Sequence, residues 1–284
     1  MGNLDLEKFI DKQRAGWNDV AEGWDRWDAW IDECLAPVDH EIVSLSEAKS
    51  GFDTLDIGSG TGYPAVRVAE TVGSDGSVVG IDLSDNMLNV ARKRAVSKGF
   101  DHLNFQTCDA RILPFEDEKF NTVTSRFCFM FIPDLDSTIA ETYRVLKDGG
   151  CVAAAVWASA DKNHSLSMPV KIMQEYPEVP SPPPPPAPGI FSLGASGELA
   201  GRMKLAGFSD IKESYVHMMW EYPSSKDYFK RLMDMAAPMR GMLSMLPPAK
   251  QAEAKEKIID TAEKFATDGV LKVPGVALVV KARK

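Results

Sequence analysis

Three glycines at alternate positions, Gly58, Gly60 and Gly62, follow a strand-like run at 54–57 and precede helix-forming sequence. Glycine tolerates positive φ and lets a ligand approach the backbone closely. The helix that follows offers unpaired N–H groups at its N-terminus. Asp56 stands just before the turn, where a carboxylate would repel a pyrophosphate but could accept hydrogen bonds from a ligand ammonium group. The pattern predicts a strand, a tight turn and a helix that together bind a small ligand.

A second acid, Asp82, ends the apolar run 77–82 and lies 20 residues after Gly62. This spacing is typical of a carboxylate that binds ribose hydroxyls. The third glycine of a dinucleotide-binding pattern would fall at position 63, which is Tyr63. The sequence therefore disfavours NAD and FAD and favours another ribose-containing ligand.

Strand-like and helix-like segments alternate along the chain, which predicts an α/β fold with a doubly wound, parallel sheet. Ser84 is expected to cap a helix over 85–98 that Gly99 ends. Another helix is expected to run to Leu146. The expected strands are 54–57, 77–82, 103–107, 120–127, 151–157, 211–220 and 276–282.

The order of motifs after the glycine turn resembles the UbiE/Coq5-like branch of class I S-adenosylmethionine (SAM) dependent methyltransferases. The resemblance covers about residues 50–157 and implies a seven-stranded sheet whose last strand is antiparallel. The motifs that carry it are Asp82-Leu83-Ser84 with Met87, Leu88 and Ala91, then Asp109-Ala110, then Tyr143-Arg144-Val145-Leu146 with Gly149-Gly150.

The resemblance also implies roles for single residues. Asp56 and the three glycines would hold the methionine moiety of SAM, and Asp82 would hold the ribose. Leu83 would pack on the adenine, whose amino group Asp109 would bind. The cofactor site implied in this way comprises Asp56, Gly58, Ser59, Gly60, Gly62, Asp82, Leu83, Met87, Asp109, Ala110 and Arg126. No metal is expected, and the product of the cofactor would be S-adenosylhomocysteine (SAH).

Some of these residues have a simpler interpretation. A strand-end acid such as Asp109 is often only a turn residue. Leu83 and Met87 would be ordinary core residues in any such fold. Asp82 alone could be a helix-initiating acid, although its place after an apolar strand favours the ribose.

Composition limits the class of partner. The net charge is −9, and all of it lies in residues 1–56, which hold 14 acidic and 5 basic residues. An acidic chain without a basic stripe disfavours nucleic acid as the substrate. The four cysteines have no metal-site spacing. No signal peptide or membrane-length apolar run is evident, so a cytoplasmic protein is expected. The oligomeric state stays open.

Segments outside the predicted sheet are expected to determine the substrate specificity. Residues 1–50 should form a helical cap on a methyltransferase domain at 51–284, with lid insertions at about 158–193 and 224–268. The first segment carries Trp17, Trp24, Trp27 and Trp30. We favour rings that anchor the cap on the sheet over an aromatic, acidic wall for a cationic substrate. The second segment contains the proline run 182–186, which favours a stiff lid or rim.

Histidine suits proton removal near neutral pH, and His164 is the candidate general base. Methyl transfer from a sulfonium is a displacement that depends mainly on alignment. The sequence therefore predicts a SAM-dependent methyltransferase of a small, partly apolar molecule. A quinone or polyprenyl C-methyltransferase is one alternative. A SAM-binding regulatory protein without turnover is an alternative of another class.

Overall fold

The computed structural model describes residues 6–183 and 187–284, and the part of the proline run at 184–186 lies outside them. Its centre is one sheet with the strand order β3-β2-β1-β4-β5-β8-β6. The strands are β1 (Asp53–Ile57), β2 (Ser77–Asp82), β3 (Leu103–Thr107), β4 (Phe120–Arg126), β5 (Leu146–Trp157), β6 (Ser209–Tyr222) and β8 (Val270–Arg283), with the short β7 (Ala266–Thr267) paired to β8.

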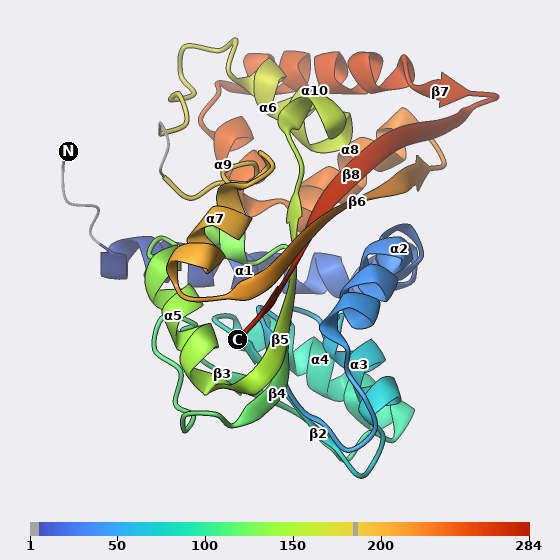
Figure 1. The fold of residues 1–284 in the computed structure, drawn as a ribbon. Coiled ribbons are helices and arrows are strands. Elements are labelled where there is room, and N and C mark those ends of the chain that lie inside the picture. Colours follow the sequence, from blue (N-terminus) through green and yellow to red (C-terminus); the bar gives the residue numbers. More distant parts are fainter. Residues whose placement is uncertain (1–5, 184–186) are drawn as a thin grey trace.

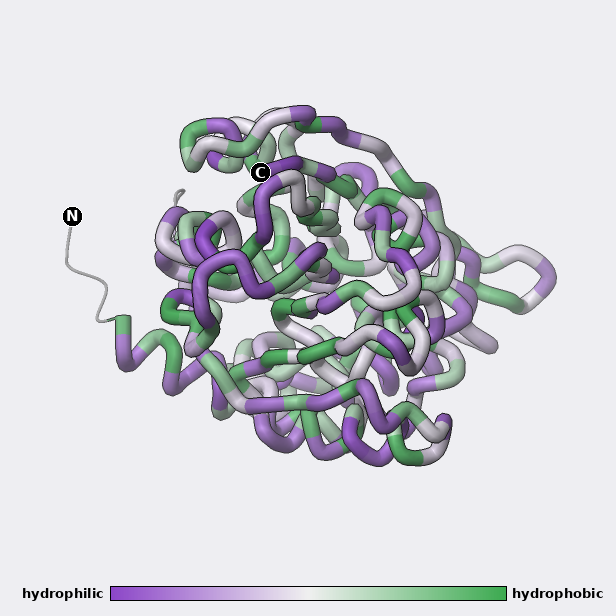
Figure 2. Tube along the Cα trace, turned by 60° about the horizontal axis from the view of Figure 1, so that its bottom comes forward, coloured by the Kyte–Doolittle hydropathy of each residue, from purple (hydrophilic) through white to green (hydrophobic). Residues whose placement is uncertain are grey.

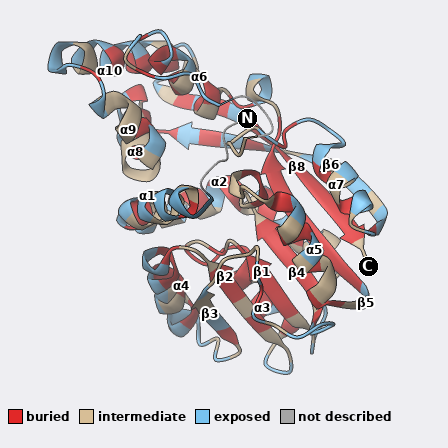
Figure 3. Cartoon of the chain, turned by 90° about the vertical axis from the view of Figure 1, so that its left-hand side faces the viewer, coloured by how far each residue is buried: buried red, intermediate tan, exposed pale blue. Residues whose placement is uncertain are grey.

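The strands β3, β2, β1, β4 and β5 are parallel to one another, and β8 runs antiparallel between β5 and β6. The predicted doubly wound α/β sheet with an antiparallel last strand is therefore confirmed. The two-residue strand β7 is an addition that the sequence pattern did not predict. The sheet strands are largely buried between the helices (Figure 3).

The sheet is flanked by α3 (Ala65–Val72), α4 (Asp85–Lys98), α5 (Leu135–Val145) and α7 (Glu198–Leu205). The bounds of α4 agree with the prediction because its signals are local. The Ser84 hydroxyl accepts the N–H of Met87 at 3.1 Å, and Gly99 ends the helix with a φ of 71°. Both caps satisfy terminal backbone groups that the helix leaves unpaired.

Helix α2 (Asp28–Ser46) packs on the strands β4, β5, β6 and β8. The remaining helices lie beyond one end of the parallel strands (Figure 1). They are α1 (Leu6–Arg26), α6 (His164–Met173), α8 (Ser225–Met235), α9 (Ala237–Ser244) and α10 (Pro248–Glu263), with short 3-10 turns at Phe129–Phe131 and Ala160–Lys162. The insertion at 224–268 forms three helices, and Pro238 lies in the first turn of α9, since proline fits a first helical turn and not a helix interior.

Helix α1 packs between the carboxyl ends of the strands and the helices α8 and α9 (Figure 3). Figure 2 shows hydrophilic and hydrophobic residues alternating along it, as in an amphipathic helix. Val20 and Ala21 are buried with Met87 of α4. The indole N–H of Trp24 donates to the Met235 carbonyl at 3.1 Å. These contacts support the interpretation that the tryptophans anchor this segment.

Helix α2 is tied to the sheet by a buried ion pair. Asp39 has no exposed surface, and both its oxygens accept bonds from Arg126 at 2.9 Å. Arg67 of α3 donates to the same carboxylate at 3.3 Å. Burial raises the pKa of Asp39 although both arginines act to lower it. Removal of this acid would leave the Arg126 side chain, which is only 7% exposed, without its partner.

We therefore expect Asp39→Ala to lower the free energy of unfolding by about 3–5 kcal/mol, the usual effect of leaving one buried charge unpaired. Asp32→Ala is the matched control. Asp32 pairs with the same Arg67 but is 32% exposed, so its loss should cost less than about 1 kcal/mol. Urea titration at pH 7 measures both values. Equal losses in the two variants would contradict the role given to Asp39.

Candidate functional site

The three glycines of the turn after β1 serve different purposes. Gly58, Gly60 and Gly62 have φ values of 74°, 51° and 112°. A side chain at Gly58 would collide with Cys128, and a Cβ at Gly62 would lie 3.3 Å from the Cβ of Ala91. A Cβ at Gly60 would meet nothing within 4 Å. Two glycines therefore permit close packing, and the middle one borders open space where a ligand could lie.

The Asp82 carboxylate joins this turn to the turn after β2. One oxygen accepts the N–H of Gly60 at 2.9 Å, and the other accepts the N–H of Ser84 at 2.8 Å. Burial raises the pKa of Asp82 against the effect of these bonds. The residue is only half-buried, and each carboxylate oxygen has a second lone pair. Asp82 can therefore hold both turns and still accept ligand hydroxyls.

Asp56 is engaged with protein neighbours in this structure. Its side chain has no exposed surface, and it accepts bonds from Ser59 Oγ at 2.6 Å and Thr124 Oγ1 at 2.7 Å. Burial raises its pKa to about 6. Ser59 is buried as well. Both residues therefore support the glycine turn, and the contact of Asp56 with the methionine moiety of SAM stays a prediction.

Asp109 follows β3 and is held by its own loop. Its carboxylate accepts bonds from Arg111 Nε at 3.0 Å and Nη2 at 2.8 Å. Burial would raise the pKa of Asp109, but the bonds from Arg111 outweigh it and the pKa is lowered. Arg111 also reaches Glu7 of α1 at 3.2 Å. Leu83, Asp109 and Ala110 all keep some exposed surface, so binding of adenine there stays a prediction.

Two other predicted cofactor residues are engaged with protein neighbours. Arg126 ends β4, and its guanidinium is nearly buried and binds Asp39 of α2. Met87 is 3% exposed and packs against Val20 and Ala21 of α1. The cofactor contacts that the family resemblance implies for Arg126 and Met87 stay predictions.

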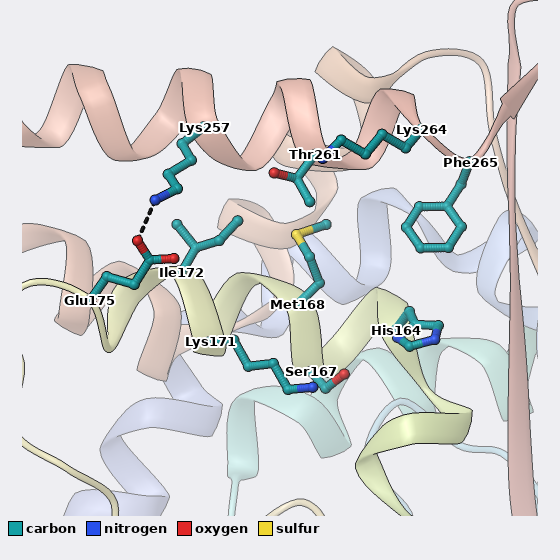
Figure 4. Close-up of a pocket in the computed structure, with 10 residues that line it drawn as sticks. All are labelled: His164, Ser167, Met168, Lys171, Ile172, Glu175, Lys257, Thr261, Lys264 and Phe265. Carbon is teal, nitrogen blue, oxygen red and sulfur yellow. Dashed lines mark hydrogen bonds and ion pairs between the residues drawn. The ribbon is translucent and has the colours of Figure 1, made fainter.

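His164 lies away from the glycine turn. It begins α6, and its ring centre is 5.7 Å from that of Phe265. The two residues line a groove of about 380 Å³ between α6 and α10, together with Met168, Lys171 and Thr261 (Figure 4). The groove contains no member of the predicted cofactor site. The role of His164 as general base stays a prediction.

An aromatic cluster that the sequence analysis missed lies at the carboxyl ends of β4 and β5. Phe127 stacks on Trp157 with ring centres 3.8 Å apart. Trp157 lies 5.9 Å from Trp220 of β6, which lies 5.4 Å from Trp30 of α2. Phe127 directly follows β4, and Trp157 is the last residue of β5. These aromatic residues at strand ends are the sequence signal that could have predicted the cluster. Cys128 connects the cluster to Gly58, which it closely approaches.

Two properties of the described residues bear on the class of site. No helix in residues 6–183 or 187–284 combines the length and apolar character needed to cross a bilayer. Within the same ranges, no group of three or more His, Cys, Asp or Glu side chains could hold a metal ion. The expected cytoplasmic location and the expected independence from metal stay predictions.

The segment that holds the glycine turn is similar in sequence to known methyltransferases. Residues 48–181 match a family model described as "Methyltransferase domain". The ubiquinone/menaquinone biosynthesis C-methyltransferase UbiE of Xylella fastidiosa (strain 9a5c) is 39% identical over 110 residues, which are 38% of this chain and 44% of that protein. The chain thus matches less than half the length of this curated relative.

Solved structures share the fold at low sequence identity. The YcgJ protein from Bacillus subtilis is 19% identical with a TM-score of 0.59, covering 87% of this chain and 97% of its own. Haemonchus contortus phosphoethanolamine N-methyltransferase 2, in complex with S-adenosyl-L-methionine, is 21% identical with a TM-score of 0.56. That alignment covers 100% of this chain and 60% of the other.

The raised pKa of Asp56 predicts a pH-dependent stability. The folded pKa of about 6 lies above the usual aspartate pKa of 3.8, so protonation of Asp56 stabilises the folded protein relative to the unfolded chain. This contribution is complete below about pH 4 and is lost as the pH rises through 6. Asp56→Asn, which stays neutral, should therefore gain stability relative to the wild type between pH 4 and 7, by up to about 3 kcal/mol. Urea titrations at both pH values measure this; a difference that does not change with pH would contradict it.

Proposed function

We propose that this protein is a class I methyltransferase that transfers a methyl group from SAM to a small, partly apolar molecule, because residues 48–181 match a methyltransferase family model and 110 residues of the chain are 39% identical to a UbiE protein. The observation that carries the proposal is the Asp82 carboxylate, which joins Gly60 and Ser84 beside open space. SAM supplies an activated methyl group on a sulfonium and leaves as SAH. The chain's own residues bind it and align the acceptor.

The residues around the glycine turn fit this cofactor. Asp82 offers free lone pairs to ribose hydroxyls, and Gly60 leaves room for the ligand. Leu83 and Ala110 keep apolar surface on the side of Asp82 where β2 and β3 end, which suits a flat adenine ring. Asp56 acts as a positioning residue through Ser59.

The acceptor side supports a partly apolar substrate. The aromatic cluster begins at Phe127 and Trp157, at the same carboxyl edge as the glycine turn, which is where ligands bind in open α/β sheets. A quinone C-methyltransferase is supported by the likeness to UbiE. The UbiE match covers 38% of this chain, and Trp30 and Trp220 lie outside residues 48–181, which match the family model. A binding protein without turnover is the alternative of another class, and a nucleic acid substrate is disfavoured by the charge of −9.

We further propose that residues 1–50 form a cap that excludes water from the methyl group. Asn18 of α1 accepts the hydroxyl of Ser84 at 2.7 Å, directly beside the Asp82 turn. Asn86 donates to the Asn18 carbonyl at 3.2 Å. The insertions 158–193 and 224–268 supply α6 and the helices α8–α10 that cover the same end of the molecule.

Asp82→Ala should weaken SAM and SAH binding by about tenfold or more, because charge-assisted bonds worth about 1.5–3 kcal/mol are lost. Isothermal titration calorimetry measures both ligands. Asp85→Ala is the matched control, since Asp85 is an exposed acid three residues later that binds Arg92 and Thr107. Unchanged affinity in Asp82→Ala would remove this residue from the cofactor site.

Methyl transfer itself is tested with SAM that carries a tritiated methyl group and a metabolite library. Incorporation of label by the wild type, lost in Asp82→Ala, would support an enzyme. Tight SAM binding with no acceptor among small aromatic and apolar metabolites would favour a sensor. Saturable NADH binding at micromolar concentration would contradict the cofactor assignment.

Asn18→Ala should loosen α1 from the Ser84 turn while leaving its buried face intact. Hydrogen exchange should then be faster at residues 10–30, and SAH should protect this segment less than it does in the wild type. Methyl transfer should fall more than SAH affinity falls. Asp11→Ala, which removes an exposed pair with Arg14 on the same helix, is the control. Equal exchange in all three proteins would rule out the cap.

A further inference from the structure

Arg231 of α8 is a nearly buried cation without a hydrogen-bond acceptor for two of its nitrogens. It is 7% exposed, and its Nε and Nη1 atoms are buried and unpaired. Arg126, which is also nearly buried, binds a carboxylate twice. Buried polar groups are almost always hydrogen-bonded, and an exception calls for an explanation. One explanation is a ligand whose acceptor atoms bind the unpaired N–H groups of Arg231.

Aromatic rings enclose the Arg231 guanidinium. Its central carbon lies 4.5 Å from the ring centre of Trp27, 4.4 Å from that of Trp30 and 5.7 Å from that of Tyr222. The rings are fixed, because Trp27 donates to Asp234 Oδ2 at 2.8 Å and Trp30 to the Glu221 carbonyl at 2.6 Å. Ring faces attract a cation but offer no carboxylate or carbonyl oxygen to the buried N–H groups.

The acids nearest to Arg231 on its own helix have other partners. Asp227, one turn earlier, accepts the Ser224 hydroxyl at 2.8 Å. Asp234 accepts bonds from Arg26 and Trp27, both at 2.8 Å. No ion pair to Arg231 occurs among residues 6–183 and 187–284. Burial lowers the pKa of Arg231, with Asp227 acting against it. The positive charge therefore lacks a paired counter-ion.

This arginine is connected to the cofactor end of the sheet by ring contacts. Trp30 touches both Arg231 and Trp220, and Trp220 lies beside Trp157. Trp157 stacks on Phe127, the neighbour of Cys128 that packs against Gly58. The indole N–H of Trp220 is a second buried donor without an acceptor. The unpaired donors thus belong to the aromatic cluster that borders the glycine turn.

We propose that Arg231 anchors a carboxylate of the methyl acceptor, whose apolar or aromatic body packs on the surrounding rings. This inference rests on the proposed methyl transfer and names the substrate class. A planar guanidinium suits a carboxylate because its N–H groups match the two oxygens. In this proposal Arg231, and not a cationic substrate, lies against the rings of Trp27 and Trp30.

The test uses benzoate as the probe and tryptophan fluorescence of the SAH-loaded protein as the signal. Benzoate should bind saturably to the wild type, and Arg231→Met should bind it about tenfold or more weakly, because charge-assisted bonds are lost. Benzyl alcohol, the neutral analogue, should not distinguish the two proteins. Arg231→Lys keeps the charge but not the planar pair of donors, so its affinity should be intermediate.

Stability separates an anchor from a structural arginine. Arg231→Met removes unpaired donors, so its melting temperature should not fall below that of the wild type. The matched control is Arg144→Met: Arg144 binds Glu141, Asp117 and two carbonyls away from the rings. This control should melt at a lower temperature and bind benzoate normally. A fall in Arg231→Met as large as in the control would overturn the proposal.

Calorimetry with SAH distinguishes the source of the carboxylate. Arg231→Met should bind SAH as the wild type does. A parallel loss of SAH affinity would assign Arg231 to the methionine carboxylate of the cofactor and overturn the proposal, as would benzoate binding that is absent in the wild type or equal in the variant. Benzoate is also titrated without SAH. If the wild type fails to bind SAH, the proposed function fails on its own, whatever benzoate does.

Discussion

The Asp82 carboxylate is the interaction on which the ligand-binding end of this fold depends. It accepts one backbone N–H from the turn after β1 and one from the turn after β2. Without the Asp82 carboxylate, the backbone N–H groups of Gly60 and Ser84 would lose their hydrogen-bond acceptor. Ser84 in turn caps α4 and donates to Asn18 of α1. Asp82 therefore holds the turns after β1 and β2 together, and through Ser84 it is connected to the first turn of α4 and to α1.

Local signals allowed the fold to be predicted, and the missing parts depend on long-range contacts. The limits of α4 follow from Ser84 and Gly99, which act on adjacent backbone groups. No glycine or proline at Trp27 indicates in the sequence that the chain breaks there between α1 and α2. It is accompanied by the bond from the Trp27 indole to Asp234, more than two hundred residues away. No pattern within a short window contains that information.

In the candidate site, too, local sequence signals predicted some features of the acidic residues, while others depend on long-range contacts. Asp82 is the last residue of β2 and keeps surface, whereas Asp56 lies inside β1, level with Thr124 on β4. Sequence spacing placed both acids at the sheet edge, but only register shows that Asp56 is covered and bonded to its neighbour. For Arg126, the family resemblance implied a cofactor contact, and its bond to Asp39 could not be predicted because the packing of α2 on the sheet depends on long-range contacts.

Arg231 and the rings nearest to it lie outside the part of the chain that matches the methyltransferase family model. Residues 48–181 hold the glycine turn, Asp82 and the Phe127–Trp157 stack. Trp27, Trp30, Tyr222 and Arg231 come from segments before and after them. The family match therefore carries no information about these four side chains. A buried guanidinium without a counter-ion costs free energy, which is why the proposal of an anionic acceptor rests on Arg231 and not on the family match.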